Sequence, residues 1–548
     1  MVEWLADIVD QLGVPRDAFI GLRETPTARH LRYMDLMSRP QATAVVGLPE
    51  GVVEVSGKAA LYVVRDQLMA GDPSDTRLVQ LMRTLACRAD AAYLAVVSPA
   101  TTTIYQVGFY REGELPTVDR VIDAHDAIGL RNLINGQVAD SRQAHADRLW
   151  LDDVLFKLLT ESAEALRSAF STKHLSDGDV LSLIGRALFT RFLVDRDILK
   201  SDDIATIVPG AQRAEVLFAD VDNLVATFQW LDQIFNGDLL DLGTKEYRGF
   251  LERFGSSAKM ICDVLSAVMS RASGGQLSLD WDGLRFQHIP VDVLSQVYEH
   301  FAHRFMPEQA RKTSIHYTPR GIAELLVDGV FGAMPEGQRH RASVLDPAAG
   351  AGVFLVLAFR RLVAEHWLYS GKRPRRATIR RVLTQQLCGL DINPTSIKVA
   401  ALSLYLAALE LDPQPQPLGD LRFERLFDST LRCVDQAHLD QAVDSELGSL
   451  SSQLRSLGPF DIVLANPPWT GLPGRFKKLL DQIPREREEK RSARDKSLVP
   501  NQWPDMAFMW RSTQWCRPGG VIGLLVHARL LSAKRRQPCE PVGSPRHA

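Results

Sequence analysis

The chain has 548 residues, of which 45% are hydrophobic, so it is long and apolar enough for about three or four domains with sizeable cores. Its 64 Lys and Arg residues nearly balance 66 Asp and Glu residues, and the net charge of -2 excludes a global basic field that would attract nucleic acid; such contacts must come from local patches. The six cysteines are scattered without a CxxC or a paired His spacing, which argues against a disulfide framework or a zinc site and fits a reducing cytoplasm.

Residues 1–145 are predicted to form a small α/β domain. Strand-like runs separated by Gly and Pro occur at 42–47, 52–55, 59–64, 94–98 and 103–107. A magnesium-dependent nuclease would need an acidic residue and a Glu-x-Lys on adjacent strands. Here Glu54 and Lys58 are four positions apart, and their side chains would not converge on one ion. We therefore expect a domain that is non-catalytic or a degenerate relative of a nuclease.

Residues 146–300 are predicted to be helical. Apolar residues recur at three-to-four spacing between 151 and 159 and again between 181 and 192. Ser176-Asp-Gly-Asp and Asn236-Gly-Asp have the composition of caps and turns between helices. The pattern favours a helical packing domain that ends in the segment Phe286 to Glu299.

The third predicted domain, residues 301–531, opens on the sequence Tyr317-Thr318-Pro319 ahead of a helix near Ile322. Thr318 can act as the N-cap of this helix, with Pro319 at the first helical position. A helix start of this kind leaves free backbone amides and the positive end of the helix dipole, which bind carboxylates.

A strand, a glycine turn and a helix are predicted in that order between Val344 and Leu355. The turn has the sequence Asp346-Pro-Ala348-Ala-Gly350-Ala-Gly352-Val-Phe354. It permits close backbone approach of a ligand at the carboxyl end of the strand, although it lacks the Gly-x-Gly-x-x-Gly of dinucleotide-binding folds.

A second strand, 387–391, ends in Asp391 and is followed by Ile392 and a helix over 397–409. A carboxylate at such a strand end can accept hydrogen bonds from both hydroxyl groups of a ribose. A third strand-like segment closes at Ser429 and contains Asp428. The pair Gly419-Asp420 is an alternative to Asp428 as the source of the acidic side chain at this third strand end.

The most informative stretch is a buried strand at 462–464 followed by Asn466-Pro467-Pro468-Trp469. The prolines end the strand and remove backbone donors, so the Asn466 side-chain oxygen and the Pro467 carbonyl can accept two hydrogen bonds from one NH2 group. The ring of Trp469 offers a surface on which a base can stack. Two fixed acceptors favour a tetrahedral nitrogen, and this frees a lone pair that is otherwise delocalised into a nucleobase.

The last part of the chain alternates charged and apolar segments. Residues 475–496 carry both charges and are predicted to form a solvated helix, with a DNA-facing lid as the alternative. A helix from Asp505 to near Cys516 contains Phe508, which would back a base pocket or belong to the core. A buried strand is predicted at 518–526, and residues 532–548 have the composition of a disordered tail.

The order of these motifs over 285–530 resembles the gamma group of DNA adenine-N6 methyltransferases, of the restriction-modification type with a large helical lead-in. The resemblance implies an α/β fold with a Rossmann-like class I methyltransferase sheet, preceded by the helical domain and the small N-terminal α/β domain. It implies S-adenosyl-L-methionine as cofactor, no metal, and a flipped adenine in double-stranded DNA as the substrate. The implied catalytic residues are Asn466, Pro467, Pro468 and Trp469, and the implied cofactor-binding residues are Tyr317, Thr318, Pro319, Asp346, Ala348, Gly350, Gly352, Phe354, Asp391, Ile392 and Asp428.

Two features set further expectations. The methyltransferase sheet of this group normally continues with a hairpin and a target-recognition domain, so we expect a truncated or frameshifted chain, an incomplete sheet, and a partly exposed apolar row at Val521, Leu524 and Val526. A separate specificity or restriction subunit would then supply recognition.

No uncharged run approaches the roughly 18 apolar residues of a membrane span, so no membrane partner is expected. The alternatives are a protein-glutamine methyltransferase and a non-catalytic scaffold of a defence complex.

Overall fold

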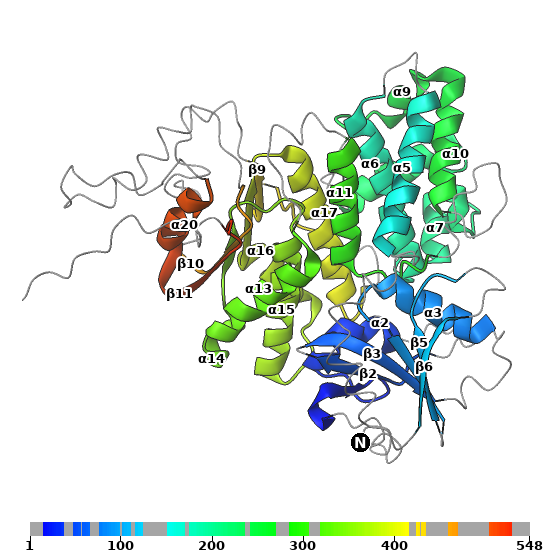
Figure 1. Cartoon of the computed structure of the whole chain (residues 1–548). Helices are drawn as coiled ribbons and strands as arrows, with labels where there is room; N and C mark the ends of the chain where they lie inside the picture. Colours follow the sequence, from blue (N-terminus) through cyan, green and yellow to red (C-terminus); the bar gives the residue numbers. More distant parts are fainter. Residues whose placement is uncertain are drawn as a thin grey trace, which may run out of the picture.

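The computed structural model describes residues 15–528 except for 38–47, 56, 66–75, 92, 99–100, 111–115, 124–150, 170–174, 236–239, 241, 270–283, 306–317, 416–422, 428, 434–458 and 469–503. Within these residues the chain builds an N-terminal sheet, a group of helices, and a C-terminal sheet layered with helices (Figure 1). The predicted fold class is confirmed.

The N-terminal sheet has six strands that lie side by side in chain order. They are β1 (Phe19–Gly21), β2 (Gly51–Val55), β3 (Lys58–Arg65), β4 (Tyr93–Val97), β5 (Thr101–Gln106) and β6 (Val118–Asp123). Neighbours are antiparallel except β3 and β4, which are parallel because helix α3 (Thr76–Arg88) connects them. Four predicted strands are confirmed, the run at 42–47 lies outside the described residues, and β1 and β6 were not predicted.

A chain of buried polar contacts joins this sheet to the helical part of the chain. Arg88, at the end of α3, is 2% exposed and forms ion pairs with Asp90 and with Asp35 of helix α2 (Met34–Met37). The second oxygen of Asp35 lies 2.9 Å from Nδ1 of His288, which lies just before the last helix of the helical part. Burial alone would raise the pKa of Asp35, but the charge of Arg88 and the contact with His288 more than offset it and hold the pKa below its usual range.

The helical part contains α5 (Leu151–Ala169), α6 (Asp177–Asp195), α7 (Ser201–Ile207), α8 (Val221–Ile234), α9 (Tyr247–Glu252), α10 (Ala258–Met269) and α11 (Val291–Phe305). The predicted cap at Ser176 is confirmed, because its hydroxyl accepts a hydrogen bond from the Asp179 amide at 3.1 Å. The segment that begins at Asn236 lies outside the described residues. Helix α11 packs against both α5 and the helices of the C-terminal part, so one continuous core joins the two parts.

The C-terminal sheet consists of β7 (Val344–Asp346), β8 (Leu387–Asp391), β9 (Leu431–Cys433), β10 (Phe460–Ala465) and β11 (Cys516–Leu524). Its strand order is β11-β10-β7-β8-β9, with all neighbours parallel. Counted from its own first strand and read from β9, this is the order 3-2-1-4-5 of doubly wound α/β sheets. The order reverses between β7 and β10.

Helices cover both faces of this sheet because successive strand residues point to opposite sides. One set of strand residues packs against α13 (Arg320–Ala333), α15 (Val353–Ser370) and α17 (Pro394–Leu411), namely Val344, Leu387, Ile462 and Leu464. The opposite set packs with α20 (Pro504–Trp515), namely Leu345, Cys388, Leu390 and Val463. Residues 462–464 are 0% exposed, as predicted for a strand covered on both faces. The short helices α14 (Glu336–Arg339) and α16 (Arg376–Gln385) complete the connections.

Two strand predictions are wrong in detail. The sequence predicts a strand that closes at Ser429, but the strand is β9, and Phe427 makes only an isolated bridge to Leu431. The Ser429 hydroxyl donates to the carbonyls of Arg425 and Leu426, and this local bonding favours a turn over a strand.

The strand predicted as buried at 518–526 is β11, the edge strand of the described sheet, in which Ile522 is 37% exposed. Val521 and Leu524 are half-buried and Val526 is 37% exposed, so the expected partial exposure of this apolar row is confirmed. An edge strand has a neighbour on one side only, which leaves its side chains less covered than those of β10.

Helix α17 is long and apolar enough to span a membrane by length and composition, and no second helix of the described residues is. Within the fold 72% of it is buried, because it packs between the sheet and α11. Its apolarity therefore has a structural explanation in the core.

Candidate functional site at the carboxyl edge of the C-terminal sheet

The carboxyl ends of β7 and β10 lie side by side at the point where the strand order reverses. In doubly wound sheets, ligands bind outside the strand ends at this position, because the connections on either side leave in opposite directions. Asp346 ends β7 and Asn466 follows β10. The structure therefore brings the glycine-loop motif and the Asn-Pro-Pro motif, 120 positions apart in the sequence, to one edge.

The loop after β7 depends on glycine. Gly350 and Gly352 have φ angles of 53° and 85°, in the left-handed region that side chains other than glycine adopt at a cost. A Cβ atom at Gly352 would lie 3.1 Å from Cβ of Ala400 in α17. Asp346 is fully buried, and its Oδ1 accepts a hydrogen bond from the Ala348 amide at 3.1 Å. The loop is thus a tight, defined turn that leads directly into α15.

Asp391 connects this loop to the end of β8. Its Oδ2 accepts from the Gly350 amide at 2.9 Å, and its Oδ1 accepts from the Asn393 amide at 2.8 Å. Asn393 in turn caps α17 by accepting from the Thr395 amide. Asp391 is half-buried. Its carboxylate therefore supports the glycine loop, and since a carboxylate offers about four acceptor positions, this is compatible with the predicted contact to a ribose.

The side chain of Asn466 is held by a residue 148 positions earlier. Its Nδ2 group donates to Oγ1 of Thr318 at 2.9 Å. Thr318 is 7% exposed, and Asn466 is half-buried at the end of β10. Because the donor end of the amide is bound by Thr318, the orientation of the acceptor end is set by the same contact.

The expected role of Thr318 as a helix cap is wrong. Helix α13 begins at Arg320, its N-cap is Pro319, and no side chain caps it. The Pro319 carbonyl accepts from the amides of Ile322 and Ala323. The hydroxyl of Thr318 binds the Asn466 amide in place of the helix amides, a long-range partner that no local pattern indicates.

The remaining predicted site residues pack in or against the cores, follow Asn466 directly, or lie outside the described residues. Phe354 is 2% exposed in the main core, and Ala348 and Ile392 pack against the smaller core under α20. Phe508 is 4% exposed and makes an edge contact with Trp515, which supports the core alternative for this residue. Pro467 is buried and Pro468 half-buried beside Asn466. The predicted residues Tyr317, Asp428 and Trp469, the alternative Asp420 and the charged segment 475–496 lie outside the described residues.

Ser343 and Asp461 support the site from the opposite end of the strands. The Asp461 carboxylate accepts from the amide and the hydroxyl of Ser343, both at 2.8 Å, and forms an ion pair with Arg517. These contacts tie together β7, β10 and β11. Asp461 directly precedes the predicted strand at 462–464, but its partners could not be predicted from the sequence.

The described residues hold no group of three or more His, Cys, Asp and Glu side chains arranged to bind a metal. In the N-terminal sheet, Glu54 accepts a hydrogen bond from the Tyr33 hydroxyl at 2.8 Å, whereas Lys58 contacts α13. The two side chains therefore have separate structural partners.

Comparison with known proteins shows that part of the chain matches a known family. Residues 290–537 match the family of N-6 DNA methylases. The chain is similar to the methylase subunit of the type I restriction enzyme MjaIX of Methanocaldococcus jannaschii, with 23% identity over 247 residues, which are 45% of this chain and 35% of that protein. It is similar to the methylase subunit of the type I restriction enzyme HindI of Haemophilus influenzae, with 27% identity over 121 residues, 22% of this chain and 23% of the relative. The chain thus spans about a third or less of the length of these two relatives.

Among solved structures, the chain is similar to the methyltransferase subunit of a type I restriction-modification system from Streptococcus thermophilus. The identity is 17%, the TM-score is 0.35, and the match covers 68% of this chain and 74% of that one.

Proposed function

Since residues 290–537 match the N-6 DNA methylases, we propose that this part of the chain transfers a methyl group from S-adenosylmethionine to N6 of adenine in DNA, within a restriction-modification or phage-defence system. The observation that carries the proposal is the orientation of Asn466. Its amide is bound by Thr318 beside the glycine loop, at the strand reversal where ligands of such sheets bind.

The groups at this edge fit S-adenosylmethionine. Asp391 would accept from the ribose hydroxyls, and the loop from Asp346 to Gly352 would hold the methionine part, since its glycines allow a ligand to approach the backbone closely. When bound, S-adenosylmethionine supplies a methyl group already activated by its sulfonium. The chain has to position the second substrate beside it.

Asn466 and Pro467 would perform this positioning. The adenine amino group donates its two hydrogens to the Asn466 side-chain oxygen and the Pro467 carbonyl, and the nitrogen lone pair is thereby turned away from the ring. Orientation of the amine in this way supplies most of the rate enhancement that the protein has to provide. The adenine has to leave the base stack to reach this loop, which costs a few kcal/mol. Trp469 and Pro468 are proposed to line the space that receives the base.

Substitution of Asn466 by alanine tests the proposal. Asn466→Ala is expected to lower transfer of tritiated methyl groups to plasmid DNA on the order of 100-fold, while calorimetry gives unchanged cofactor affinity. Asn223→Ala, in helix α8 of the helical part, is the matched control and should keep the wild-type rate. Wild-type transfer by Asn466→Ala would contradict the catalytic role, and label in protein in place of DNA would point to glutamine methylation.

We further propose a separate specificity or restriction subunit as the partner of this chain. The relatives named above are themselves methylase subunits. Sequencing of methylated sites on plasmid DNA after treatment with the isolated chain tests this point. A defined methylated motif would contradict the need for a partner in recognition.

A further inference from the structure

A lysine of the N-terminal sheet contacts the helix that leads out of the candidate site. Nζ of Lys58, at the start of β3, donates to the Gly321 carbonyl at 3.2 Å and lies 3.3 Å from Oε2 of Glu324. Both partners belong to the first two turns of α13, 263 and 266 positions later in the sequence. The Lys58 side chain is 41% exposed and that of Glu324 is 9% exposed. The hairpin formed by β2 and β3 is thus attached to α13.

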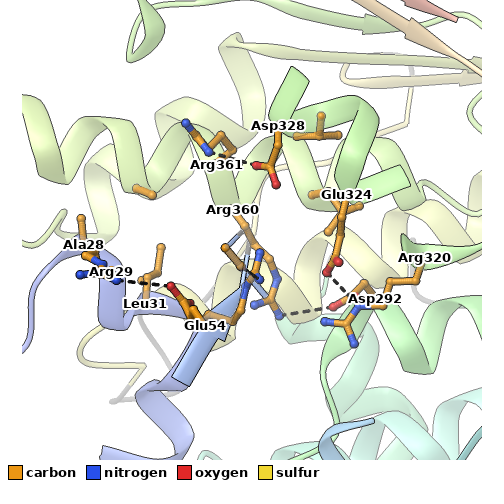
Figure 2. Close-up of a pocket in the computed structure, with 15 residues that line it drawn as sticks. Ala28, Arg29, Leu31, Glu54, Asp292, Arg320, Glu324, Asp328, Arg360 and Arg361 are labelled. Atoms are coloured by element: carbon orange, nitrogen blue, oxygen red, sulfur yellow. Dashed lines mark hydrogen bonds and ion pairs between the residues drawn. The ribbon is translucent and has the colours of Figure 1, made fainter. Parts of the chain in front are cut away.

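This contact continues into a network of ion pairs. Nε of Arg320 lies 3.1 Å from Glu324 Oε1 and 2.6 Å from Oδ2 of Asp292 in α11, and Asp292 lies 3.9 Å from Nη2 of Arg360 in α15. Figure 2 shows these side chains pointing toward one another beside a cavity of about 210 Å³ between the N-terminal sheet and the helices. Burial would raise the pKa of Asp292, but the charges of Arg320 and Arg360 hold it below its usual value, so the carboxylate is charged at neutral pH.

The attached end of α13 lies next to the residue that orients Asn466. Only Pro319 and Arg320 separate Thr318 from Gly321. The ring of Pro319 restricts its backbone, and its carbonyl is bound by the amides of Ile322 and Ala323 at 2.9 and 3.0 Å. Thr318 therefore moves with the first turn of the helix, and its hydrogen bond to Asn466 moves with it.

We propose that Lys58 is a positioning residue: by binding Gly321 and Glu324, the N-terminal sheet holds the first turn of α13 and thereby the Thr318 hydroxyl that orients Asn466. The N-terminal part of the chain then contributes to methyl transfer without touching either substrate. The effect on rate rests on the proposed function, whereas the attachment itself does not. Lys58 is partly exposed and Glu324 keeps its ion pair with Arg320, so loss of Lys58 should cost little global stability. A small displacement of a reacting group lowers a rate strongly, so we expect a larger effect on rate than on stability.

The test compares Lys58→Met with two other variants. Lys58→Arg keeps the charge and should restore the contact, and Lys157→Met removes a lysine of α5 that is 74% exposed and lies 3.8 Å from Glu161. Hydrogen–deuterium exchange is measured at the amides of 320–324 and 462–466, together with single-turnover methyl transfer to DNA at saturating cofactor. In Lys58→Met we expect exchange about tenfold faster in both segments and transfer roughly tenfold slower, with cofactor affinity and melting temperature unchanged.

The outcomes separate the inference from the proposed function. Unchanged exchange in both segments of Lys58→Met would overturn the inference, whatever the transfer rate, and so would equal effects of Lys58→Met and Lys157→Met. Faster exchange together with a wild-type transfer rate would overturn the positioning role. Faster exchange in a chain whose wild type does not methylate DNA would support the attachment and count against the proposed function.

Discussion

The hydrogen bond between Thr318 and Asn466 gives the sharpest test of how the site is built. Thr318→Val replaces the hydroxyl by a methyl group of similar size, so the 7% exposed position stays filled and only the acceptor is lost. The Asn466 amide then lacks the partner that orients it. Loss of a neutral hydrogen bond that leaves a partly buried donor unpaired costs about 1–2 kcal/mol, towards the lower value where water can reach the amide.

If this free energy is felt in the transition state, the rate of methyl transfer falls about 5- to 30-fold. The assay is single-turnover transfer of tritiated methyl groups to DNA at saturating cofactor. Thr318→Ser keeps the acceptor and should stay within about twofold of wild type. In an Asn466→Ala background, Thr318→Val should have no further effect, because both changes remove the same interaction. Equal rates for wild type, Thr318→Val and Thr318→Ser would refute the idea that this bond orients the amide.

Three further predictions follow from other contacts. Asp391→Ala removes the acceptor of the glycine-loop amide as well as the predicted ribose acceptor, so calorimetry should show cofactor binding weaker by roughly 1.5–3 kcal/mol, and unchanged affinity would assign both roles elsewhere. Gly352→Ala forces a side chain into the left-handed region and against Ala400, so denaturant unfolding should show a loss of about 1–2 kcal/mol; a variant as stable as wild type would mean that the loop adjusts. The pKa of Asp35 is depressed in the folded state by Arg88, so its stabilisation is complete above the unfolded pKa of about 4 and is lost as the pH falls below it. The free energy of unfolding should therefore fall more steeply with acid in wild type than in Asp35→Asn, and parallel pH profiles would contradict this.

Local patterns were sufficient for two features of the C-terminal sheet, the strand before Asn466 and the turn after Asp346. The unalternating apolar run before Asn466 predicted a strand covered on both faces, and residues 462–464 are fully buried. The glycines after Asp346 predicted a tight turn between strand and helix, and both have positive φ angles. These features depend on neighbours within a few residues, so they can be read along the chain.

The same patterns failed at two polar residues, Thr318 and Ser429. Thr318 had the residue type of a helix cap, but its hydroxyl binds Asn466, because the end of β10 brings that amide to 2.9 Å from it. The predicted strand at Ser429 was displaced by local hydrogen bonds to the Arg425 and Leu426 carbonyls. The partner of Thr318 lies far away in the sequence and depends on the three-dimensional arrangement, whereas the partners of Ser429 are three and four positions earlier and form a local alternative to a strand.

Apolar periodicity, glycine and proline act over short distances, so most of the strands could be predicted from the sequence alone, with the exceptions of β1, β6 and the position of β9. Which residues carry the chemistry stays a prediction. The three-dimensional structure was needed to show that β10 lies beside β7, that Lys58 of the N-terminal sheet reaches α13, and that β11 stands at an edge of the described sheet. Strand order and contacts across more than 100 residues arise from packing of whole layers, and the pattern within any one segment is compatible with several such arrangements.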